Sequence, residues 1–485
     1  MDAQNKNITD EKDLPKEVQE DIKKDLSSGQ EIYVEELPYW TRICVSENRI
    51  VKDFIIEIPE LKQEVSVGNI YKGIIQDVIP SLQAVFINVG AERNVYMFVP
   101  SKEKTIEYKV GQEIVIQVKK ESIDGKGAKV TDNPTLPGKY IVLTFEKKNG
   151  VSKKIKSKYE RNRLKKIVQK LHEDINGEFG VVARTEAENI PEELIIEDFN
   201  RIYKSMKEIK QKIETVPPPT LLWSDTDTIQ KTVREFASSN IRKFISNSKE
   251  TLNKIKETVQ EYIPKMVDKI EFVYEEEPFI FSKYKLEDEF FNLLKDEIEI
   301  EGGIRLIFNE TEAFTAIDVN TASFTGAENL DITAYQANLM AIRETIRQIE
   351  LRRIGGIIII DLIDIKSKQL KNKMINEIKR LAEKSKDKTK VFGLTRLGLL
   401  EISRKKSGYS LKKTLMSRCP TCNEGFVNSD ILNLHTTMLK IAKHKGKTIK
   451  VSPENYKKID DIVKKLKLNT VIQPKYGLGK WEIEI

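Results

Sequence analysis

Short stretches in which apolar and polar residues alternate dominate the first third of the chain. Residues 31–57 contain β-type stretches that are broken at Pro38 and Pro59, because proline cannot donate the hydrogen bond that a central strand requires. Residues 65–133 continue with five more stretches separated by turn residues, NIYKGIIQDVI, LQAVFINVG, VYMFV, EIVIQVKK and AKVTD. Several short strands at this spacing predict a small five-stranded barrel.

Longer stretches in which apolar residues recur with the helical period follow, and they change the predicted fold class. After residue 140, a basic run and the strand-like stretch GVVARTEAE precede helical patterns that end near Glu214, and the prolines at 217–219 mark a boundary. Residues 226–268 are predicted to be mostly helical. From Phe279 onward, apolar strands alternate with helices, which indicates a layered α/β domain. The chain is therefore expected to be a multidomain α+β protein.

Composition narrows the class further. Uninterrupted apolar runs such as Ile357 to Ile360 are far too short to span a bilayer. Residues 1–30 are charged and aperiodic, which predicts a disordered tail, and they contain neither a signal peptide nor a transit peptide, so we expect a cytoplasmic protein without a membrane span. Residues 361–418 hold 17 Lys/Arg against 6 Asp/Glu. This suits a polyphosphate partner, although a Lys-rich solvated surface explains it equally well.

Two aspartates end apolar strands. Asp318 stands in TAIDVNT and Asp361 in IIIIDLI, and the end of a rigid strand often borders a functional crevice. Neither carboxylate can be buried unpaired without a large desolvation cost, and two carboxylates with water suit Mg²⁺. Asn320 shares a strand face with Asp318, so its amide could reach a phosphate oxygen. Turn capping, or pairing with a nearby Arg or Lys, explains the aspartates at least as well.

Histidine is scarce, which bears on the chemistry. His172, His435 and His444 are the only histidines of the sequence, and none lies near the aspartates along the chain. A nuclease that uses paired histidines as acid and base is therefore not expected. Water activated by a metal ion is the alternative, and it would leave 5′-phosphate and 3′-hydroxyl ends.

Phe86 and Tyr96 stand out in the predicted barrel, with Lys120 on a later strand. Aromatic side chains on one face of such a barrel can stack on bases, while a neighbouring lysine meets phosphate. Without further context, two core aromatics are the better interpretation.

Several long motifs in a fixed order resemble the RNase E/G family of endoribonucleases. They are GGIRLIFNETEAFTAIDVNTASFTG, then NLMAIRETIRQIELRRIGGIIIIDLIDI, then TRLGLLEISRKK, and finally CPTC. NIYKGIIQDVIPSLQAVFINVGAERN similarly resembles the family's S1-type RNA-binding module. The resemblance runs from about Asn69 to Cys422. A chain of this length without a long scaffold region is more similar to ribonuclease G than to full-length ribonuclease E.

The resemblance implies a domain layout. The expected parts are a tail (1–30), the first part of an RNase H-like subdomain (31–64), an S1-type OB-fold barrel (65–133), a 5′-sensor subdomain (134–216), the rest of the RNase H-like subdomain (217–278), a DNase I-like catalytic domain (279–414), a zinc link (415–427) and a small C-terminal domain (428–485).

The resemblance also implies roles for individual residues. Asp318 and Asp361 match the two magnesium-binding aspartates of the family, and Asn320 matches the residue that holds the scissile phosphate. Phe86, Tyr96 and Lys120 match RNA-contacting positions. Arg184 and Thr185 match the pocket that senses a 5′-monophosphate in the family, and the loop from Gly125 to Gly127 is expected to close this pocket. A guanidinium and a hydroxyl together can bind a terminal phosphate from several directions.

Some positions depart from the family pattern. Met340 replaces a glutamate, Leu362 a phenylalanine and Ile365 a methionine, and an arginine often found after the first metal motif is missing in TASFTG. Both metal aspartates are unchanged. The departures therefore put rate and cleavage preference in doubt more than reaction type.

Cys419 and Cys422 form the half of a zinc knuckle, CPTC. Structural zinc usually takes four ligands. The remaining cysteine, Cys44, is expected to be a buried apolar residue, and the histidines are not placed to complete a zinc finger. Two chains that share one zinc ion would complete the site, and the family uses such a link, so we predict a homodimer with zinc. A redox role is the alternative, and whether dimers pair into tetramers stays open.

The implied function is a magnesium-dependent endoribonuclease that cuts single-stranded RNA in mRNA decay and in the processing of rRNA and tRNA precursors. A non-catalytic RNA-binding scaffold is the main alternative, and the unchanged Asp318, Asn320 and Asp361 argue against it. An interaction factor of an RNA-decay assembly is a third possibility, but the chain lacks the low-complexity arm that it would favour.

Overall fold

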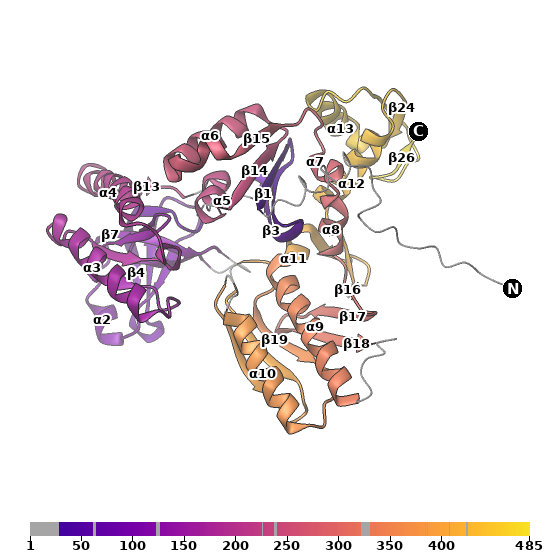
Figure 1. Cartoon of the computed structure of the whole chain (residues 1–485). Helices are drawn as coiled ribbons and strands as arrows, with labels where there is room; N and C mark the ends of the chain where they lie inside the picture. Colours follow the sequence, from indigo (N-terminus) through magenta and orange to yellow (C-terminus); the bar gives the residue numbers. More distant parts are fainter. Residues whose placement is uncertain are drawn as a thin grey trace.

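The computed structural model describes residues 29–61, 65–122, 127–225, 227–236, 240–321, 330–383, 385, 387–406, 408–422 and 425–485. Across these ranges the chain is a mixed α+β protein, as predicted, in which separate sheets carry their own helices (Figure 1). The predicted tail at 1–30 lies almost entirely outside them. Among the helices of these ranges, none combines the length and the apolar character that crossing a membrane requires.

The first sheet joins strands that are far apart in the sequence. Its order is β15-β14-β1-β2-β3, and β1 runs parallel to β14 and antiparallel to β2. The region predicted to be mostly helical, 226–268, contains two helices and, between them, β14, which the pattern missed. The elements are β1 (Gln30–Leu37), β2 (Trp40–Glu47), β3 (Ile50–Glu57), α5 (Thr228–Phe236), β14 (Ile241–Ser246), α6 (Lys249–Tyr262) and β15 (Glu271–Tyr274).

The predicted five-stranded barrel is confirmed. Strands β4, β5, β6, β8 and β7 pair in this order, and β4 also pairs with β7, which closes the ring. Gly73 lies where β4 approaches β5, and a Cβ there would be 2.8 Å from the carbonyl oxygen of Asn88, so closure requires glycine. The elements are β4 (Ile70–Ile79), β5 (Ala84–Asn88), β6 (Val95–Phe98), α2 (Lys102–Ile106), β7 (Glu113–Lys120), β8 (Lys129–Thr131) and β13 (Thr220–Trp223), which pairs with β4 outside the ring.

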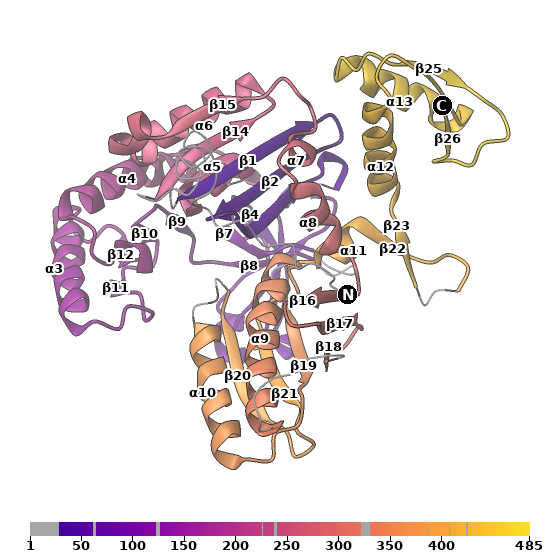
Figure 2. The ribbon, with the colours of Figure 1, turned by 45° about the vertical axis from the view of Figure 1, so that its right-hand side comes forward.

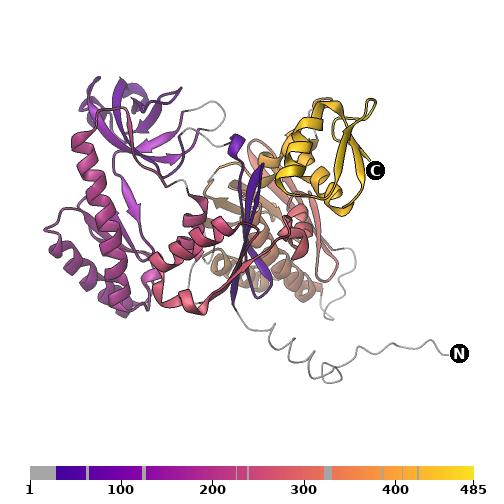
Figure 3. The same ribbon diagram turned by 90° about the horizontal axis from the view of Figure 1, so that it is seen from above.

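The basic region after the barrel forms a small sheet with two long helices. The strand order is β11-β12-β10-β9, and α3 and α4 cover one face of it with a shared apolar core. Seen from above, these helices and the barrel form one lobe, apart from the C-terminal elements (Figure 3). The elements are β9 (Thr135–Pro137), β10 (Ile141–Thr144), β11 (Gly150–Val151), α3 (Lys158–Asp174), β12 (Gly180–Ala183) and α4 (Glu192–Thr215).

The layered α/β domain predicted after Phe279 contains a sheet of order β16-β17-β18-β19-β21-β20. Helices α9 and α10 pack side by side on one face of it (Figure 2). The elements are α7 (Ile280–Lys283), α8 (Leu286–Asn292), β16 (Glu297–Ile300), β17 (Ile304–Glu310), β18 (Phe314–Thr321), α9 (Leu330–Leu351), β19 (Gly356–Asp361), α10 (Lys368–Glu383), β20 (Thr389–Leu394), β21 (Leu400–Arg404) and α11 (Leu411–Leu415).

A two-stranded hairpin leads to a small C-terminal α/β unit of strand order β25-β24-β26 (Figure 2). Here β24 and β25 are parallel, with α13 as the crossover, and β26 is antiparallel to β24. The elements are β22 (Met416–Arg418), β23 (Phe426–Asn428), α12 (Asp430–Lys443), β24 (Thr448–Val451), α13 (Pro453–Lys465), β25 (Val471–Pro474) and β26 (Ile483–Glu484).

A buried network of charges joins β1 and β2 to α8 and α12. The Arg42 guanidinium is fully buried and donates to Glu35 and Glu287, with Nε 3.0 Å from Glu35 Oε1 and Nη1 2.8 Å from Glu287 Oε1. His435 Nε2 lies 2.8 Å from the same Glu287 oxygen, and His435 Nδ1 lies 2.9 Å from the Tyr39 hydroxyl. The network therefore ties the first sheet to the C-terminal unit.

Candidate active site and nucleic-acid interface

The two aspartates expected to bind metal lie side by side on neighbouring strands. Asp318 of β18 and Asp361, the last residue of β19, are direct partners in a parallel pairing. Strands in a sheet are about 4.8 Å apart, and partnered residues project from the same face. Ile317, Val319 and Ile360, which alternate with the aspartates, are buried in the core beneath α9 and α10. Both carboxylates therefore lie on the face that these helices leave open.

Within the described ranges, no lysine or arginine forms an ion pair with Asp318 or Asp361. The interpretation of these aspartates as partners of nearby cations is thus not supported. Two carboxylates this close repel each other, and a divalent cation between them would remove the repulsion. The same ranges hold no group of three or more His, Cys, Asp or Glu side chains that is arranged to hold a metal ion. A site with two carboxylates and otherwise water ligands suits Mg²⁺ better than zinc.

Asn320 extends this centre by one more polar group. Its Nδ2 donates to Asp318 Oδ2 at 2.7 Å, and its partner across the sheet is Arg305 of β17. The amide is therefore held beside the carboxylate pair, as the strand spacing predicted. Arg305 pairs with Glu297 at 3.1 Å, so a guanidinium borders the same face, which the motifs gave no reason to expect.

A buried asparagine that the sequence did not single out fixes the chain after Asp361. Asn338 of α9 donates from Nδ2 to the carbonyl oxygen of Ile363 at 2.8 Å, and its Oδ1 accepts from the Ile363 amide at 2.9 Å. Asn338 is fully buried. This two-way contact holds the end of β19 against α9, so Asp361 sits on a rigid support.

The departures from the family pattern lie behind the carboxylates. Leu362 and Ile365 are buried in the core between the sheet and its helices, and Met340 packs against that core. These residues therefore affect apolar packing under the site. The segment in which the family arginine is missing, 322–326, lies outside the described residues.

Phe86, Tyr96 and Lys120 lie in one row across the outside of the barrel. Phe86 is paired with Tyr96, Tyr96 with Lys129, and Lys129 with Lys120. Neither aromatic residue belongs to the barrel core, so the interpretation as core aromatics is wrong. Two further members of this surface, Lys129 and Phe98, were not predicted from the sequence. Lys129 Nζ lies 5.2 Å from the ring centre of Phe98, which is 46% exposed.

Arg184 and Thr185 follow β12 and have defined partners. Arg184 Nη1 donates to the Gly138 carbonyl at 2.5 Å, and its Nε lies 3.2 Å from Glu186. The Thr185 hydroxyl lies 2.8 Å from that of Ser152.

The loop predicted to close this pocket is only partly described. Gly125 lies outside the described residues. Gly127 is described, and a Cβ there would be 2.6 Å from the carbonyl oxygen of Asn94. Gly127 thus lies against the barrel, and among the described contacts no hydrogen bond joins it to Arg184 or Thr185.

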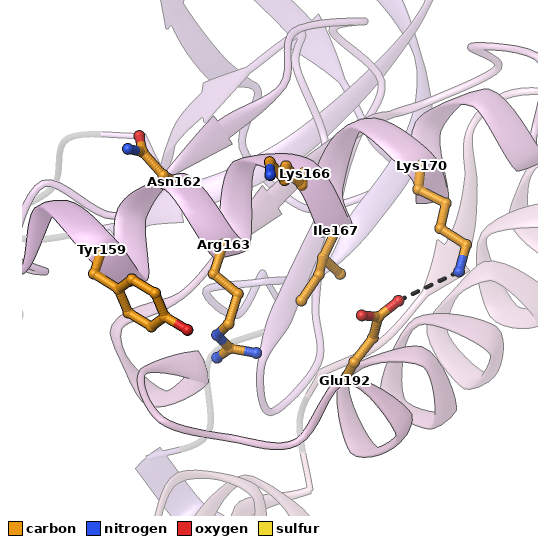
Figure 4. A pocket seen from close by; sticks show the side chains of 7 residues that line it. All are labelled: Tyr159, Asn162, Arg163, Lys166, Ile167, Lys170 and Glu192. Atoms are coloured by element: carbon orange, nitrogen blue, oxygen red, sulfur yellow. Dashed lines mark hydrogen bonds and ion pairs between the residues drawn. The ribbon is translucent and has the colours of Figure 1, made fainter.

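A shallow groove runs along α3 and is separate from the carboxylate pair (Figure 4). Its rim carries exposed Tyr159 at one end and the ion pair between Lys170 and Glu192 at the other. Arg163 in this groove is held by Glu160 at 2.8 Å. The described residues that line this groove include one carboxylate, that of Glu192, and therefore do not repeat the carboxylate pair of Asp318 and Asp361.

The cysteine pair lies in the turn of the β22–β23 hairpin. Cys419 is partly exposed and Cys422 is exposed. The backbone amides of Cys422 and Thr421 lower the pKa of the Cys419 thiol to about 7, which favours the thiolate that binds metals. Two thiolates from one chain would supply two of the four ligands that a tetrahedral zinc centre requires. Cys44 is buried in β2, as expected.

Paired carboxylates on an open sheet face, beside a barrel with aromatic and basic side chains, are typical of enzymes that cleave nucleic acids. The model of the Ribonuclease E/G family matches residues 135–407. The chain is also similar to ribonuclease G of Haemophilus influenzae, 32% identical over 81% of this chain and 83% of the relative.

Two further relatives agree. Ribonuclease G of Escherichia coli K12 is 32% identical over 81% of this chain and 83% of its own. Ribonuclease E of Nostoc is 31% identical over 73% of this chain and 53% of its own. The chain therefore belongs to the ribonuclease E/G family. It is an endoribonuclease of that type with a role in RNA processing, which leaves no support for a purely non-catalytic scaffold.

Proposed function

We propose that this endoribonuclease hydrolyses single-stranded RNA at Asp318 and Asp361 with the help of magnesium. The observation that carries the proposal is the direct register of the two aspartates on an open sheet face, where no cationic side chain of the described chain pairs with them. The donor set fits a hard cation that keeps much of its water shell.

The side chains around the pair have separate tasks in this proposal. Asp318 and Asp361 hold the ion, and Asn320, fixed by its bond to Asp318, donates from its amide to the scissile phosphate. A bound magnesium ion would lower the pKa of water and neutralise charge on the phosphoryl oxygens. The oxygen of water would bond to phosphorus as the bond between phosphorus and the 3′ oxygen breaks. The attacking water gives up one proton, and the leaving 3′ oxygen takes up one proton from the solvent. One product ends in a 3′-hydroxyl and the other begins with a 5′-phosphate.

The barrel surface supports the proposed preference for single-stranded RNA. The row of Phe86, Tyr96, Lys129 and Lys120 offers rings for bases and ammonium groups for the backbone. Bases can stack on protein rings only when they are not stacked in a duplex. We therefore propose single-stranded segments of mRNA and of rRNA and tRNA precursors as substrates. Arg184 and Thr185, with the loop from Gly125 to Gly127, are proposed to bind a 5′-terminal phosphate.

Removal of magnesium tests the proposed chemistry. On a 5′-monophosphorylated single-stranded RNA, we expect cleavage to stop in excess chelator and to return with added magnesium. End-labelling of the purified products should reveal 5′-phosphate and 3′-hydroxyl termini. Undiminished cleavage without divalent ions, or products with a 5′-hydroxyl, would contradict the mechanism.

We also propose that Cys419 and Cys422 of two chains share one zinc ion and so form a homodimer, in a cytoplasmic compartment that keeps thiols reduced. Replacing both cysteines with serine should release the zinc and yield monomers, because serine does not supply a thiolate. Metal analysis and analytical ultracentrifugation measure the two effects and reveal any tetramer. Cys44→Ala is the matched control, which should keep zinc and dimer. Dimers that persist after zinc is lost would refute the shared site.

A further inference from the structure

Lys139, which stands just before β10, has a buried ammonium group without an acceptor. The residue is 6% exposed, and its Nζ has no hydrogen-bond partner within the described part of the chain. Its Nζ lies 5.7 Å from the ring centre of Tyr140. A buried charge without a partner is unfavourable, so packing alone does not explain why a lysine occupies this position.

The carboxylate of Asp198, which lies close to Lys139, is already committed to other donors. Asp198 of α4 accepts the backbone amides of Lys139, Tyr140 and Ile141 at 3.0, 2.7 and 3.1 Å. It also accepts from the Arg201 guanidinium. These bonds fix the backbone of the segment firmly, so Lys139 cannot easily move its ammonium group back into water.

Two further cations stand around the same place. Arg184 donates to the carbonyl oxygen of Gly138, the residue before Lys139. Burial lowers the pKa of Lys139 to about 8, and the charges of Arg201 and Arg184 act in the same direction, whereas Asp198 and Glu186 oppose it. The three cations, Lys139, Arg184 and Arg201, therefore lie near two carboxylates, and within the described part of the chain neither carboxylate accepts from the Lys139 ammonium group.

We propose that the Lys139 ammonium is a further donor for the 5′-terminal phosphate of the RNA, acting beside Arg184. This rests on the proposed phosphate sensor at Arg184 and Thr185. A terminal monophosphate brings between one and two negative charges and several acceptor oxygens, and so would supply the acceptor that the Lys139 ammonium group lacks within the described part of the chain. Lys139 then contributes to the choice between RNA with a 5′-phosphate and RNA with a 5′-hydroxyl.

The experiment measures binding rather than cleavage. A short RNA with a fluorescent 3′ label, carrying either a 5′-monophosphate or a 5′-hydroxyl, is titrated with the full-length protein in chelator, and anisotropy gives the ratio of the two dissociation constants. Lys139→Met keeps the length of the side chain and removes its charge. It should reduce the preference for 5′-phosphate about tenfold, the usual weight of one charged hydrogen bond, and Lys139→Arg should retain most of it.

The pH profile separates phosphate binding from a structural role. The phosphate gains its second charge above about pH 6, and Lys139 loses its proton above about pH 8. The wild-type preference should therefore peak between these values. The charged and titratable groups that face Lys139 are Asp198 and Arg201 on α4, Arg184 and Glu186 beside β12, and Tyr140. Carboxylates, guanidiniums and phenols ordinarily titrate outside the range from pH 6 to pH 8. In Lys139→Arg the alkaline decline should disappear.

Arg184→Ala distinguishes the two levels of the proposal. Loss of preference in Arg184→Ala together with full preference in a folded Lys139→Met protein would overturn the role of Lys139 and leave the sensor intact. A wild-type protein without any preference would overturn the sensor and this inference together, while leaving magnesium-dependent cleavage unaffected. An alkaline decline that persists in Lys139→Arg would also refute the role of Lys139.

Discussion

Asp318→Asn and Asp361→Asn are each expected to lower kcat on the order of 10³-fold while RNA binding stays near normal. Metal ions stabilise phosphoryl-transfer transition states by several kcal/mol, and each 1.4 kcal/mol is about tenfold in rate. A neutral amide is a poorer ligand for a hard cation than a carboxylate. Binding should persist because the barrel row from Phe86 to Lys120 lies on another domain.

A second readout is independent of activity. If magnesium binds the folded wild type, it should raise the melting temperature, because a ligand specific for the native state stabilises it. Both variants should lose most of this shift and keep a normal melting temperature in chelator, since removing one of two adjacent like charges relieves repulsion. Full activity, or an unchanged magnesium shift in both variants, would refute the metal pair.

Glu299→Gln is the matched control for these variants. Glu299 lies on β16, is exposed, and is the register partner of Arg305, which in turn is paired with Asn320. It therefore projects from the same face of the same sheet without touching the aspartates. Its removal should leave both kcat and the magnesium shift unchanged. A loss equal to that of Asp318→Asn would indicate a general charge effect of the sheet face.

Local patterns were sufficient to predict several elements of the fold. The barrel was predictable because apolar and polar residues alternate along its strands and the strands follow each other closely in the sequence. The α/β domain was predictable because apolar strands alternate with helices. Strand β14 was missed because it pairs with β1, about two hundred residues earlier, and helices flank it on both sides. A parallel strand of this kind shows no hairpin signal in its own neighbourhood.

The candidate site was predictable in its residues but not in their arrangement. The strand-end positions of Asp318 and Asp361 were visible in the sequence, whereas their direct register depends on which strands pair. Phe98 lies two residues after Tyr96 and therefore on the same face of the strand, so its outward direction could have been inferred. The place of Lys129 beside Tyr96 follows from a parallel pairing of β6 with β8, and the burial of Lys139 follows from α4; neither can be read locally.

Arg42→Met is expected to destabilise the link between the first sheet and the C-terminal unit by about 3–5 kcal/mol, the usual cost of breaking a buried ion pair. The methionine fills much of the space but leaves Glu35 and Glu287 as buried carboxylates without a guanidinium. Hydrogen exchange of α8 and α12 should accelerate first, because both helices are held through Glu287 and His435. Replacing the exposed Arg380 with methionine is the control and should have no measurable effect.

The same network predicts loss of stability in acid, with a defined sign. Burial, and then the charge of Arg42, lowers the pKa of His435 to about 4, so the folded protein resists a proton that the unfolded chain accepts near pH 6.5. The stabilising contribution is therefore complete above pH 6.5 and is lost as the pH falls toward 4. His435→Gln, which cannot be protonated, should flatten this part of the curve of unfolding free energy against pH. An unchanged slope between pH 6.5 and 4 in this variant would show that other groups govern acid unfolding.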